Sequence, residues 1–318
     1  MLAAAALHGQ GSISGPVSEY VFDPSTSTIR AIVGAPGSAY VSKSVTAGIQ
    51  FGSVAPNGVS AITVAGDSSN FIATLTQSPL ITIPLPGAID GADQILWSLD
   101  SSAAVLFSSR GRSLQFVSQF NQQPVVQSKI DLSTLEPVTK VARGRVTAAP
   151  IVLLATDSAA KMAVIAIGGQ VYLIQNGASP QLLLKLESAK AAAFSADGSV
   201  YIVDGTANQV WAVRNPSGSP QVQSLSATPA DLGDPVGIAV QGSQFYVARS
   251  ADNRIRVYNL TTLQQTGELP LDAAASTLQP FTATSFLANA RRDPADPVLL
   301  LQTAPTPSVI FIPTGANQ

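Results

Sequence analysis

Apolar and polar residues alternate along most of this chain in short runs, and turn-forming residues separate the runs. The pattern is clearest in residues 193–213 and 235–258. Each of these stretches has an apolar run, a Gly or Asp-Gly turn, an aromatic and β-branched run, a polar loop ending in Asn, and another alternating run. Alternation with a period of two indicates strands, and a Gly or Asp-Gly turn between two such runs is typical of a hairpin. The two stretches are therefore expected to be copies of one antiparallel unit.

Weaker copies of this unit continue in both directions at intervals of about 44 residues, the length of a propeller blade. The interval is measured between the last bulky residues before the first turn of each unit, which are Phe22, Val54, Trp97, Leu154, Phe194, Ala239 and Leu287. Helical periodicity is almost absent, and residues 183–194 are interpreted as parts of two strands. The pattern predicts an all-β chain that forms one seven-bladed β-propeller of four-stranded antiparallel blades.

The stretch from Pro235 to Tyr258 resembles the repeats of the NHL and YVTN-type propellers. It contains Pro-x-Gly-Ile-Ala-Val, then Tyr-Val-Ala, then Asn253-Arg254-Ile255, and residues 193–213 are a looser match. The resemblance covers about two of the seven blades. It implies a propeller fold, and it leaves the function open because propellers of this group include lactone hydrolases as well as interaction scaffolds.

Strand order sorts the loops of such a blade onto two rims. If the strands of each blade are A to D from the centre outwards, the A-to-B turns lie on one rim, and the B-to-C turns and D-to-A connectors lie on the other. The turns at Asp100, Asp157 and Asp197 are A-to-B turns and are interpreted as structural, because Asp bonds its own backbone there. The opposite rim has the longer and more polar loops, and we expect any ligand site there.

Two groups of charged residues on that rim are candidate ligand-binding residues. Arg110-Gly-Arg112 falls in the B-to-C turn of the third blade, and Arg143-Gly-Arg145 falls in the connector that enters the fourth. The outer strand of the third blade is placed near residue 126 or near residue 139. The four guanidinium groups are expected either to converge on a carboxylate, sulfate or phosphate group, or to be solvated or paired with nearby acidic residues.

The second group lies on the fifth and sixth blades. Its members alternate in charge and are expected to form salt bridges between the blades: Asp204, Arg249, Asp252 and Arg254.

The amino-acid composition excludes several kinds of catalytic and metal site. The chain has no cysteine and one histidine, His8, which excludes thiol catalysis and Cys or His zinc sites, and we expect His8 to be dispensable. The spacings Asp90-x-x-Asp93 and Asp231-x-x-Asp234 have too few oxygen ligands for Ca²⁺. Neither a catalytic residue, a metal nor a cofactor is expected.

Charge and hydropathy limit the partners. Charged residues make up 11% of the 318 residues, the net charge is −2, and mean hydropathy is +0.27. A protein without net positive charge has no field to attract nucleic acid. The most apolar stretch, residues 150–169, contains Asp157 and Lys161 near its middle and is interpreted as two strands and not as a membrane span. The few lysines and the many Ser, Thr and Gln residues favour a periplasmic or secreted protein, and residues 1–7 resemble the end of a signal peptide.

These observations favour a non-catalytic exported propeller, expected to be a monomer, that binds a protein, peptide or glycan on the rim of B-to-C and D-to-A loops. The alternative is a hydrolase or lyase that acts on a lactone or sugar at the central channel. The last unit shows only three strands, so we expect residues 3–13 of an N-terminal segment (1–16) to add as its outer strand and to close the propeller domain (17–318). Deleting residues 1–15 should then lower the melting temperature.

Overall fold

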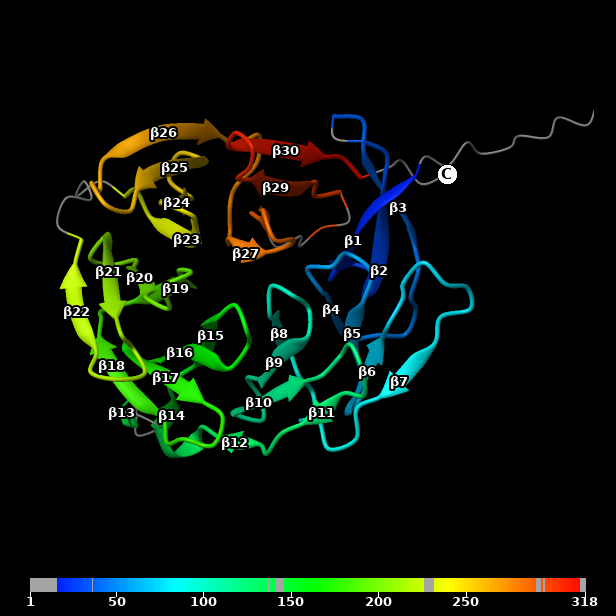
Figure 1. Ribbon diagram of the computed structural model, residues 1–318, viewed down its shortest axis with the longest axis horizontal. Helices are drawn as coiled ribbons and strands as arrows, with labels where there is room; N and C mark the ends of the chain where they lie inside the picture. Colours follow the sequence, from blue (N-terminus) through cyan, green and yellow to red (C-terminus); the bar gives the residue numbers. More distant parts are fainter. Residues whose placement is uncertain are drawn as a thin grey trace, which may run out of the picture.

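The computed structural model describes residues 16–35, 37–135, 138–140, 146–225, 232–289, 293 and 295–314, with the backbone alone at 138–140 and 146–148. Seven small antiparallel sheets stand around a central axis as the blades of a β-propeller (Figure 1). The single helical element of the described residues is a short 3-10 turn, η1 (Ser133–Leu135). The predicted all-β propeller is thereby confirmed.

The strands follow the chain order around the ring. Blade one comprises β1 (Val17–Asp23), β2 (Thr28–Val33) and β3 (Tyr40–Ser44), and blade two β4 (Phe51–Val54), β5 (Ala61–Ala65), β6 (Ser68–Ile72) and β7 (Thr82–Pro84). Blade three comprises β8 (Gln94–Trp97), β9 (Ala103–Ser108), β10 (Ser113–Ser118), β11 (Val125–Val126) and β12 (Ile130–Asp131). Blade four comprises β15 (Ile151–Thr156), β16 (Met162–Ile167), β17 (Gln170–Gln175) and β18 (Gln181–Lys185).

The remaining blades have the same four-stranded order. Blade five comprises β19 (Ala189–Phe194), β20 (Val200–Asp204), β21 (Gln209–Arg214) and β22 (Gln221–Ser224), and blade six β23 (Pro235–Gln241), β24 (Gln244–Arg249), β25 (Arg254–Asn259) and β26 (Gln265–Pro270). Blade seven comprises β27 (Gln279–Pro280), β28 (Ser285–Leu287), β29 (Val298–Gln302) and β30 (Ser308–Ile312).

Burial across a blade explains the sequence pattern. Every residue of β9 and of β20 is buried, because the second strand of a blade is covered on both faces by its neighbours. Every residue of β7 is exposed, because an outer strand lies at the surface. The cores between blades are accordingly separate apolar clusters, such as the one that joins the fifth and sixth blades around Tyr201, Phe245 and Tyr258.

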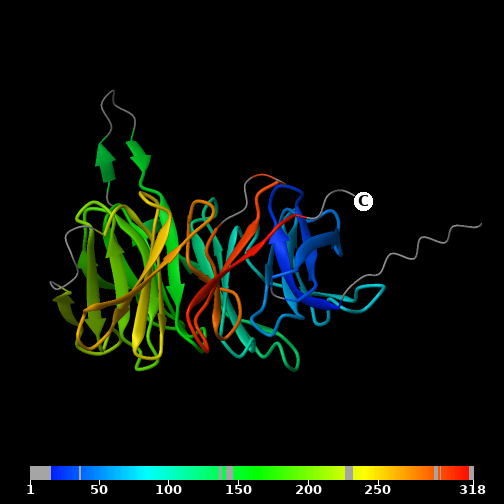
Figure 2. The same cartoon turned by 90° about the horizontal axis from the view of Figure 1, so that it is seen from above.

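The third blade resolves the ambiguity about its outer strand. Both β11 and β12 pair with β10, so the outer position lies near residue 126 and continues to residue 131. The alternative near residue 139 is wrong: β13 (Val138–Lys140) pairs with β14 (Val146–Ala148) in a separate hairpin. This hairpin stands out from the ring on the side of the D-to-A connectors (Figure 2).

The first blade does not begin with an inner strand, and the assignment of Phe22 to strand A is wrong. The end of β1 lies beside the start of β4, because the Phe22 Cδ2 atom is 3.2 Å from the position that a Cβ on Gly52 would occupy. The start of β1 lies beside the A-to-B turn of blade two, because the Glu19 Oε2 atom is 2.6 Å from the position that a Cβ on Gly58 would occupy. The two strands therefore run in opposite directions. Because neighbouring strands of a meander alternate in direction, β1 has the direction of a second strand.

The turn after β1 supports this assignment. Ser27 has a left-handed backbone (φ 53°), as do Asn208 (φ 50°) and Asn253 (φ 53°), which end the B-to-C turns of blades five and six. Each lies seven residues after a buried tyrosine, Tyr20, Tyr201 and Tyr246. The strands β1 to β3 therefore occupy positions B to D, and within the described residues the A position of this blade has no strand.

The strand assignment of the last blade is also corrected: this blade has an inner strand that the sequence analysis missed. Leu287 belongs to a second strand, because β27 pairs with β28 on the inner side, and β30 occupies the outer position that residues 3–13 were expected to fill. Residues 3–13 themselves lie outside the described residues. The ring closes where Val21 and Ile32 of blade one pack against Val298 and Leu300 of blade seven. In addition, the Val41 N–H donates to the Pro313 carbonyl (3.0 Å), and Val41 forms a parallel bridge with Thr314.

Candidate functional site

Three A-to-B turns are held by their own aspartates, as predicted. Asp197 accepts hydrogen bonds from the Ser195 hydroxyl (2.5 Å) and the Ser199 N–H (3.0 Å). Asp100 accepts equivalent bonds from Ser98 and Ser102, and Asp157 accepts the N–H groups of Lys161 and Met162 (both 2.7 Å). The hydroxyls of Ser98 and Ser195 are the main reason that the pKa values of Asp100 and Asp197 lie below the usual range.

We predict that Asp197→Ala lowers the melting temperature in a pH-dependent way. A depressed pKa means that the folded state favours the ionised form, so the stabilisation is fully present above about pH 4 and is lost as the pH falls through the folded-state pKa. The melting temperatures of the wild type and the variant, measured from pH 7 to pH 2, should therefore differ at neutral pH and converge in acid. Asp67→Ala is the matched control, because no hydrogen bond from the described residues reaches its carboxylate. A difference that persists unchanged at pH 2 would contradict the prediction.

The arginine pair of the third blade lies in the predicted B-to-C turn, but its two side chains differ in environment. Arg110 is exposed. Arg112 is half-buried with a left-handed backbone (φ 46°), and its Nη1 donates to the Ala149 carbonyl (3.2 Å) next to the fourth blade. Arg143 and Arg145 fall between β13 and β14, outside the described residues. Arg112 therefore serves partly to join two blades, and Arg110 is left as the accessible member.

A polar hollow of about 230 Å³ opens beside Arg110. It lies on the rim predicted to bind ligands, between the connector that enters blade three and the β9–β10 turn. Its lining residues are Gly87, Ala88, Ile89, Asp90, Gly111, Ser113 and Lys129. Asp90 and Lys129 are both exposed and bring opposite charges to it.

Gln115 of β10 builds the wall of this hollow. Its side chain is buried and makes three hydrogen bonds: Nε2 donates to the carbonyls of Gly87 (2.9 Å) and Gln127 (2.8 Å), and Oε1 accepts the Ile89 N–H (2.8 Å). One amide thus ties the connector that enters blade three to the segment between β11 and β12, which contains Lys129. Gln115 was not among the predicted site residues, and its one sequence signal is an amide between two apolar residues, Leu114 and Phe116.

The charged group of the fifth and sixth blades has mainly structural contacts. Arg249 is buried and pairs with Asp252 (Nη1 to Oδ2, 3.2 Å), while Arg254 and Arg256 both pair with Glu268. Arg254 is the main reason that the pKa of Glu268 is lowered. These ion pairs lie within the sixth blade, whereas salt bridges between blades were expected.

Asp204 likewise anchors backbone. It is buried, and its carboxylate accepts four N–H groups: Glu187 (3.1 Å), Ser188 (3.1 Å), Thr206 (3.1 Å) and Ala207 (3.2 Å). Two donors come from the connector that enters blade five and two from its B-to-C turn. Asp204 is therefore a clamp between two loops.

A second type of clamp appears in blades three and six. Asp93, just before β8, accepts the N–H (3.1 Å) and the hydroxyl of Ser109, just after β9. Asp234, just before β23, accepts the hydroxyl of Ser250, just after β24, and the Ser250 N–H donates to the Asp234 carbonyl (3.1 Å). The second aspartates of the two Asp-x-x-Asp spacings thus occupy equivalent positions, and both join the end of strand B to the start of strand A.

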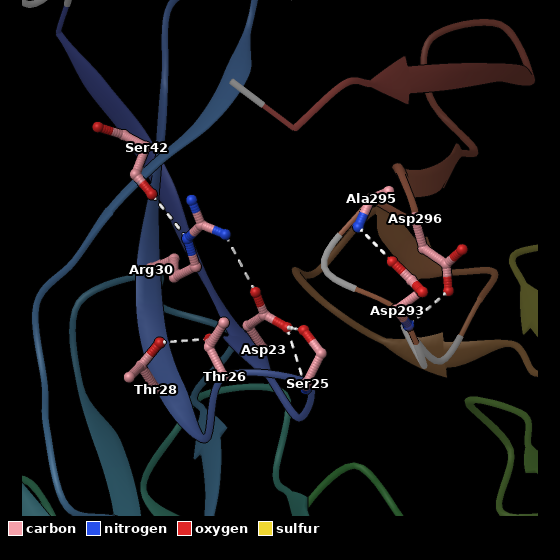
Figure 3. Close-up of polar contacts among 9 residues, drawn as sticks. All are labelled: Asp23, Ser25, Thr26, Thr28, Arg30, Ser42, Asp293, Ala295 and Asp296. Atoms are coloured by element: carbon pink, nitrogen blue, oxygen red, sulfur yellow. Dashed lines mark hydrogen bonds and ion pairs between the residues drawn. The ribbon is translucent and has the colours of Figure 1, made fainter. Parts of the chain in front are cut away.

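In the first blade, an ion pair holds the end of strand B (Figure 3). Asp23 is fully buried at the end of β1 and accepts Nη1 of Arg30 (3.1 Å) and the Ser25 N–H (3.2 Å) and hydroxyl (2.5 Å). The Arg30 Nε donates to the Ser42 carbonyl (2.7 Å). Asp23, Asp204 and Arg249 occupy the same repeat position, the last residue of a B strand.

The central channel contains a second and larger cavity, of about 410 Å³. Its lining comes from the inner strands of six blades, β4, β8, β15, β19, β23 and β27, and reaches the A-to-B turns. Sequence analysis placed the main ligand site on the rim of B-to-C and D-to-A loops and an alternative, enzymatic site at the central channel. It named no residue of this lining, because the wall is assembled from six distant segments. Among the described residues, no group of three His, Cys, Asp or Glu side chains is arranged to hold a metal ion. Asp157 is the one carboxylate in the cavity lining, and it is bound to its own turn.

Comparison with known proteins extends the description of the fold. No protein-family model and no curated protein matches the chain. A functionally unknown protein from Desulfotomaculum acetoxidans matches with a TM-score of 0.59 and 12% identity over 93% of this chain and 100% of its own. Virginiamycin B lyase from Staphylococcus aureus matches with a TM-score of 0.52 and 12% identity over 84% of each chain. The likeness is one of fold alone.

A chain of the nidogen/laminin complex is more distant. Its TM-score is 0.47, with 12% identity over 78% of this chain and 92% of that chain. In the part of this chain that the structure describes, no helix is long and apolar enough to cross a membrane.

Proposed function

We propose that this chain is a non-catalytic exported propeller that binds a protein, peptide or glycan on the rim of B-to-C turns and D-to-A connectors. The observation that carries the proposal is the polar hollow of the third blade, with Lys129 and Asp90 in its lining and Arg110 exposed beside it. Arginine next to a preformed polar depression is typical of the anchor positions of binding surfaces. In a chain with 11% charged residues, this concentration of exposed charge is distinctive.

The surroundings of the hollow support contact with an extended partner. The β13–β14 hairpin leaves the ring from the connector that follows Lys129, and it stands above this rim (Figure 2). An isolated two-stranded hairpin is only marginally stable in water. A partner that contacts the hollow and the hairpin together would bury both, whereas the propeller itself does not need the hairpin for its blades.

Array binding of paired variants tests this proposal. Three proteins are compared on peptide and glycan arrays: the wild type, Arg110→Glu/Lys129→Glu and Lys161→Glu. The wild type and Lys161→Glu should bind the same array ligands. Lys161 is an exposed lysine on the opposite rim, so its charge reversal is the matched control. Reversing two cations at the hollow should weaken each specific ligand at least tenfold, because charge-assisted contacts become repulsive. Ligands that bind all three proteins equally would exclude this rim.

Three further expectations belong to this proposal. The export of the chain, its monomeric state and its relationship to NHL or YVTN-type repeats rest on composition and on the quoted motifs. The enzymatic alternative, a lactone or sugar hydrolase or lyase in the central channel, has weaker support, because the channel lining offers no pair of carboxylates for acid and base catalysis.

A further inference from the structure

The side chains that line the central channel are mostly apolar and partly open to it. Val152 of β15 is 40% exposed and Leu99 beyond β8 is 43% exposed, although both belong to the lining of the cavity. Leu96, Leu154 and Val240 are half-buried there. Val152 and Leu99 therefore face this shared space, whereas Leu96, Leu154 and Val240 line it and also pack against the cores between blades. Such exposure is costly in water, and an apolar ligand would remove it.

Charge is almost absent from this space. Lys190 and Asp157 are the two charged residues of the lining. The Lys190 stem lies against Gly205, where a built Cβ would be 2.8 Å from the lysine Cε, and the Asp157 carboxylate is bound to the N–H groups of Lys161 and Met162. A charged ligand would lose its hydration in the channel without gaining a counter-ion.

Most polar groups of the lining are already used between blades. Gln94 of β8 makes two hydrogen bonds with the backbone of Leu153 (3.3 and 3.4 Å). The Ser53 hydroxyl donates to the Ile95 carbonyl (3.3 Å) and accepts the indole N–H of Trp97 (3.2 Å). These contacts bind blades two, three and four together, so they are part of the scaffold.

Two glutamines of the lining differ from this pattern. Gln241 at the end of β23 and Gln279 in β27 come from neighbouring blades, and among the described residues their side-chain amides have no hydrogen-bond partner. An apolar cavity of 300–1,000 Å³ with a few free polar groups is typical of a small-molecule site, and this cavity of about 410 Å³ lies in that range.

We propose that the channel is a binding site for an uncharged, mainly apolar small molecule whose hydrogen-bonding group is read by Gln241 and Gln279. This site is separate from the polar hollow of the third blade, since the two cavities have no lining residue in common. A ligand here would contact up to six blades at once. Binding should therefore stabilise the ring against opening.

Trp97 provides an internal reporter for the experiment. It lines the cavity and is 6% exposed, whereas Trp211, the other tryptophan, lies in β21, the third strand of blade five. In a Trp211→Phe background, neutral N-phenyl-1-naphthylamine should quench Trp97 emission by energy transfer. Its sulfonated analogue 8-anilinonaphthalene-1-sulfonate should bind at least tenfold more weakly, because the one cation of the lining, Lys190, lies with its stem against Gly205 at one end of the channel. Equal affinity for the two probes would overturn the proposal.

Two aspartate substitutions at similarly exposed valines locate the binding. Val152→Asp places a charge in the channel and should weaken N-phenyl-1-naphthylamine binding at least tenfold. Val222→Asp in the outer strand β22, where the valine is 43% exposed, is the matched control and should leave binding unchanged within twofold. The melting temperature of each variant separates loss of the site from loss of the fold. Equal binding by both variants, or binding that appears only after residues 1–15 are deleted, would overturn the proposal.

Discussion

Replacing Arg30 with methionine should lower the free energy of unfolding by about 3–5 kcal/mol, the usual cost of removing one partner of a buried ion pair. Asp23 is fully buried, and Arg30 provides it with a cation at 3.1 Å. Methionine preserves much of the apolar stem, so the main loss is the counter-charge and the Nε bond to Ser42. Urea unfolding followed by circular dichroism measures the change.

A double variant tests whether the loss of the Arg30 charge beside Asp23 is the cause. Asp23→Asn/Arg30→Met removes both charges and retains an acceptor for the Ser25 N–H. It should recover a large part of the stability lost in the single variant, because replacing both members of a buried pair costs much less than removing one. A double variant no more stable than Arg30→Met would show that packing, and not the broken pairing of charges, accounts for the effect of Arg30→Met.

Replacing Asp204 with alanine should destabilise the propeller by about 2–4 kcal/mol, because donors to a buried acceptor lose their partner. The four N–H groups that bind Asp204 come from two loops, so the connector between blades four and five should loosen together with the turn after β20. Hydrogen exchange of the amides of residues 187, 188, 206 and 207 should increase accordingly. Urea unfolding gives the total loss.

Asparagine at the same position provides a graded control. In the native protein, Oδ1 accepts three of the four N–H groups and Oδ2 accepts the Glu187 N–H. Asp204→Asn keeps an oxygen acceptor for the N–H groups of Ser188, Thr206 and Ala207 and presents an NH2 group to the Glu187 N–H. The stability lost in Asp204→Asn should therefore be about half of that lost in Asp204→Ala. Equal stability of Asp204→Ala and the wild type would contradict the clamp, and would return Asp204 to the list of candidate ligand-binding residues.

The fold could be predicted because the blades repeat a local signal. Residues 235–258 alternate in hydrophobicity and have a Gly-Ser turn at the hinge of the hairpin, and the structure places β23 to β25 there. The structural role of the turn aspartates was also predicted correctly, because Asp100, Asp157 and Asp197 each accept hydrogen bonds from the backbone of their own turn. These features depend on a few adjacent residues, so one sequence is enough to show them.

The same signal did not show which strand position, A or B, the first strands recognised in the first and last blades occupy. Val54 follows Phe22 by only 32 residues, which is short for a blade, because Phe22 lies near the end of a second strand and Val54 ends an inner one. In the last blade, β27 has two residues and includes Pro280, so it gives almost no alternation. The first error arises at the shortest interval of the repeat, and the second where the inner strand is shortest.

The roles of the charged residues depended on tertiary contacts. Sequence identified Asp204 and Arg249 as unusual on a charge-poor rim, but it could not show that both are buried anchors at the same repeat position. Asp23 carries the same role and was missed, because its ion pair with Arg30 becomes visible only when the turn of β1 is recognised as a B-to-C turn. The polar hollow depends on Gln115, whose three partners are 12 to 28 residues away in the chain.

The closure between blades one and seven has a consequence for synthesis on the ribosome. Blades two to six each find a neighbour in the segment made just before, so their stacking can proceed as the chain emerges. The first blade must keep the face around Val21 and Ile32 uncovered until Val298 and Leu300 have been made. Val41 then receives its backbone partners from Pro313 and Thr314, at the end of the described chain. For most of translation, therefore, the nascent protein is an open arc with one apolar end, and chaperones that bind such surfaces would be needed most at blade one.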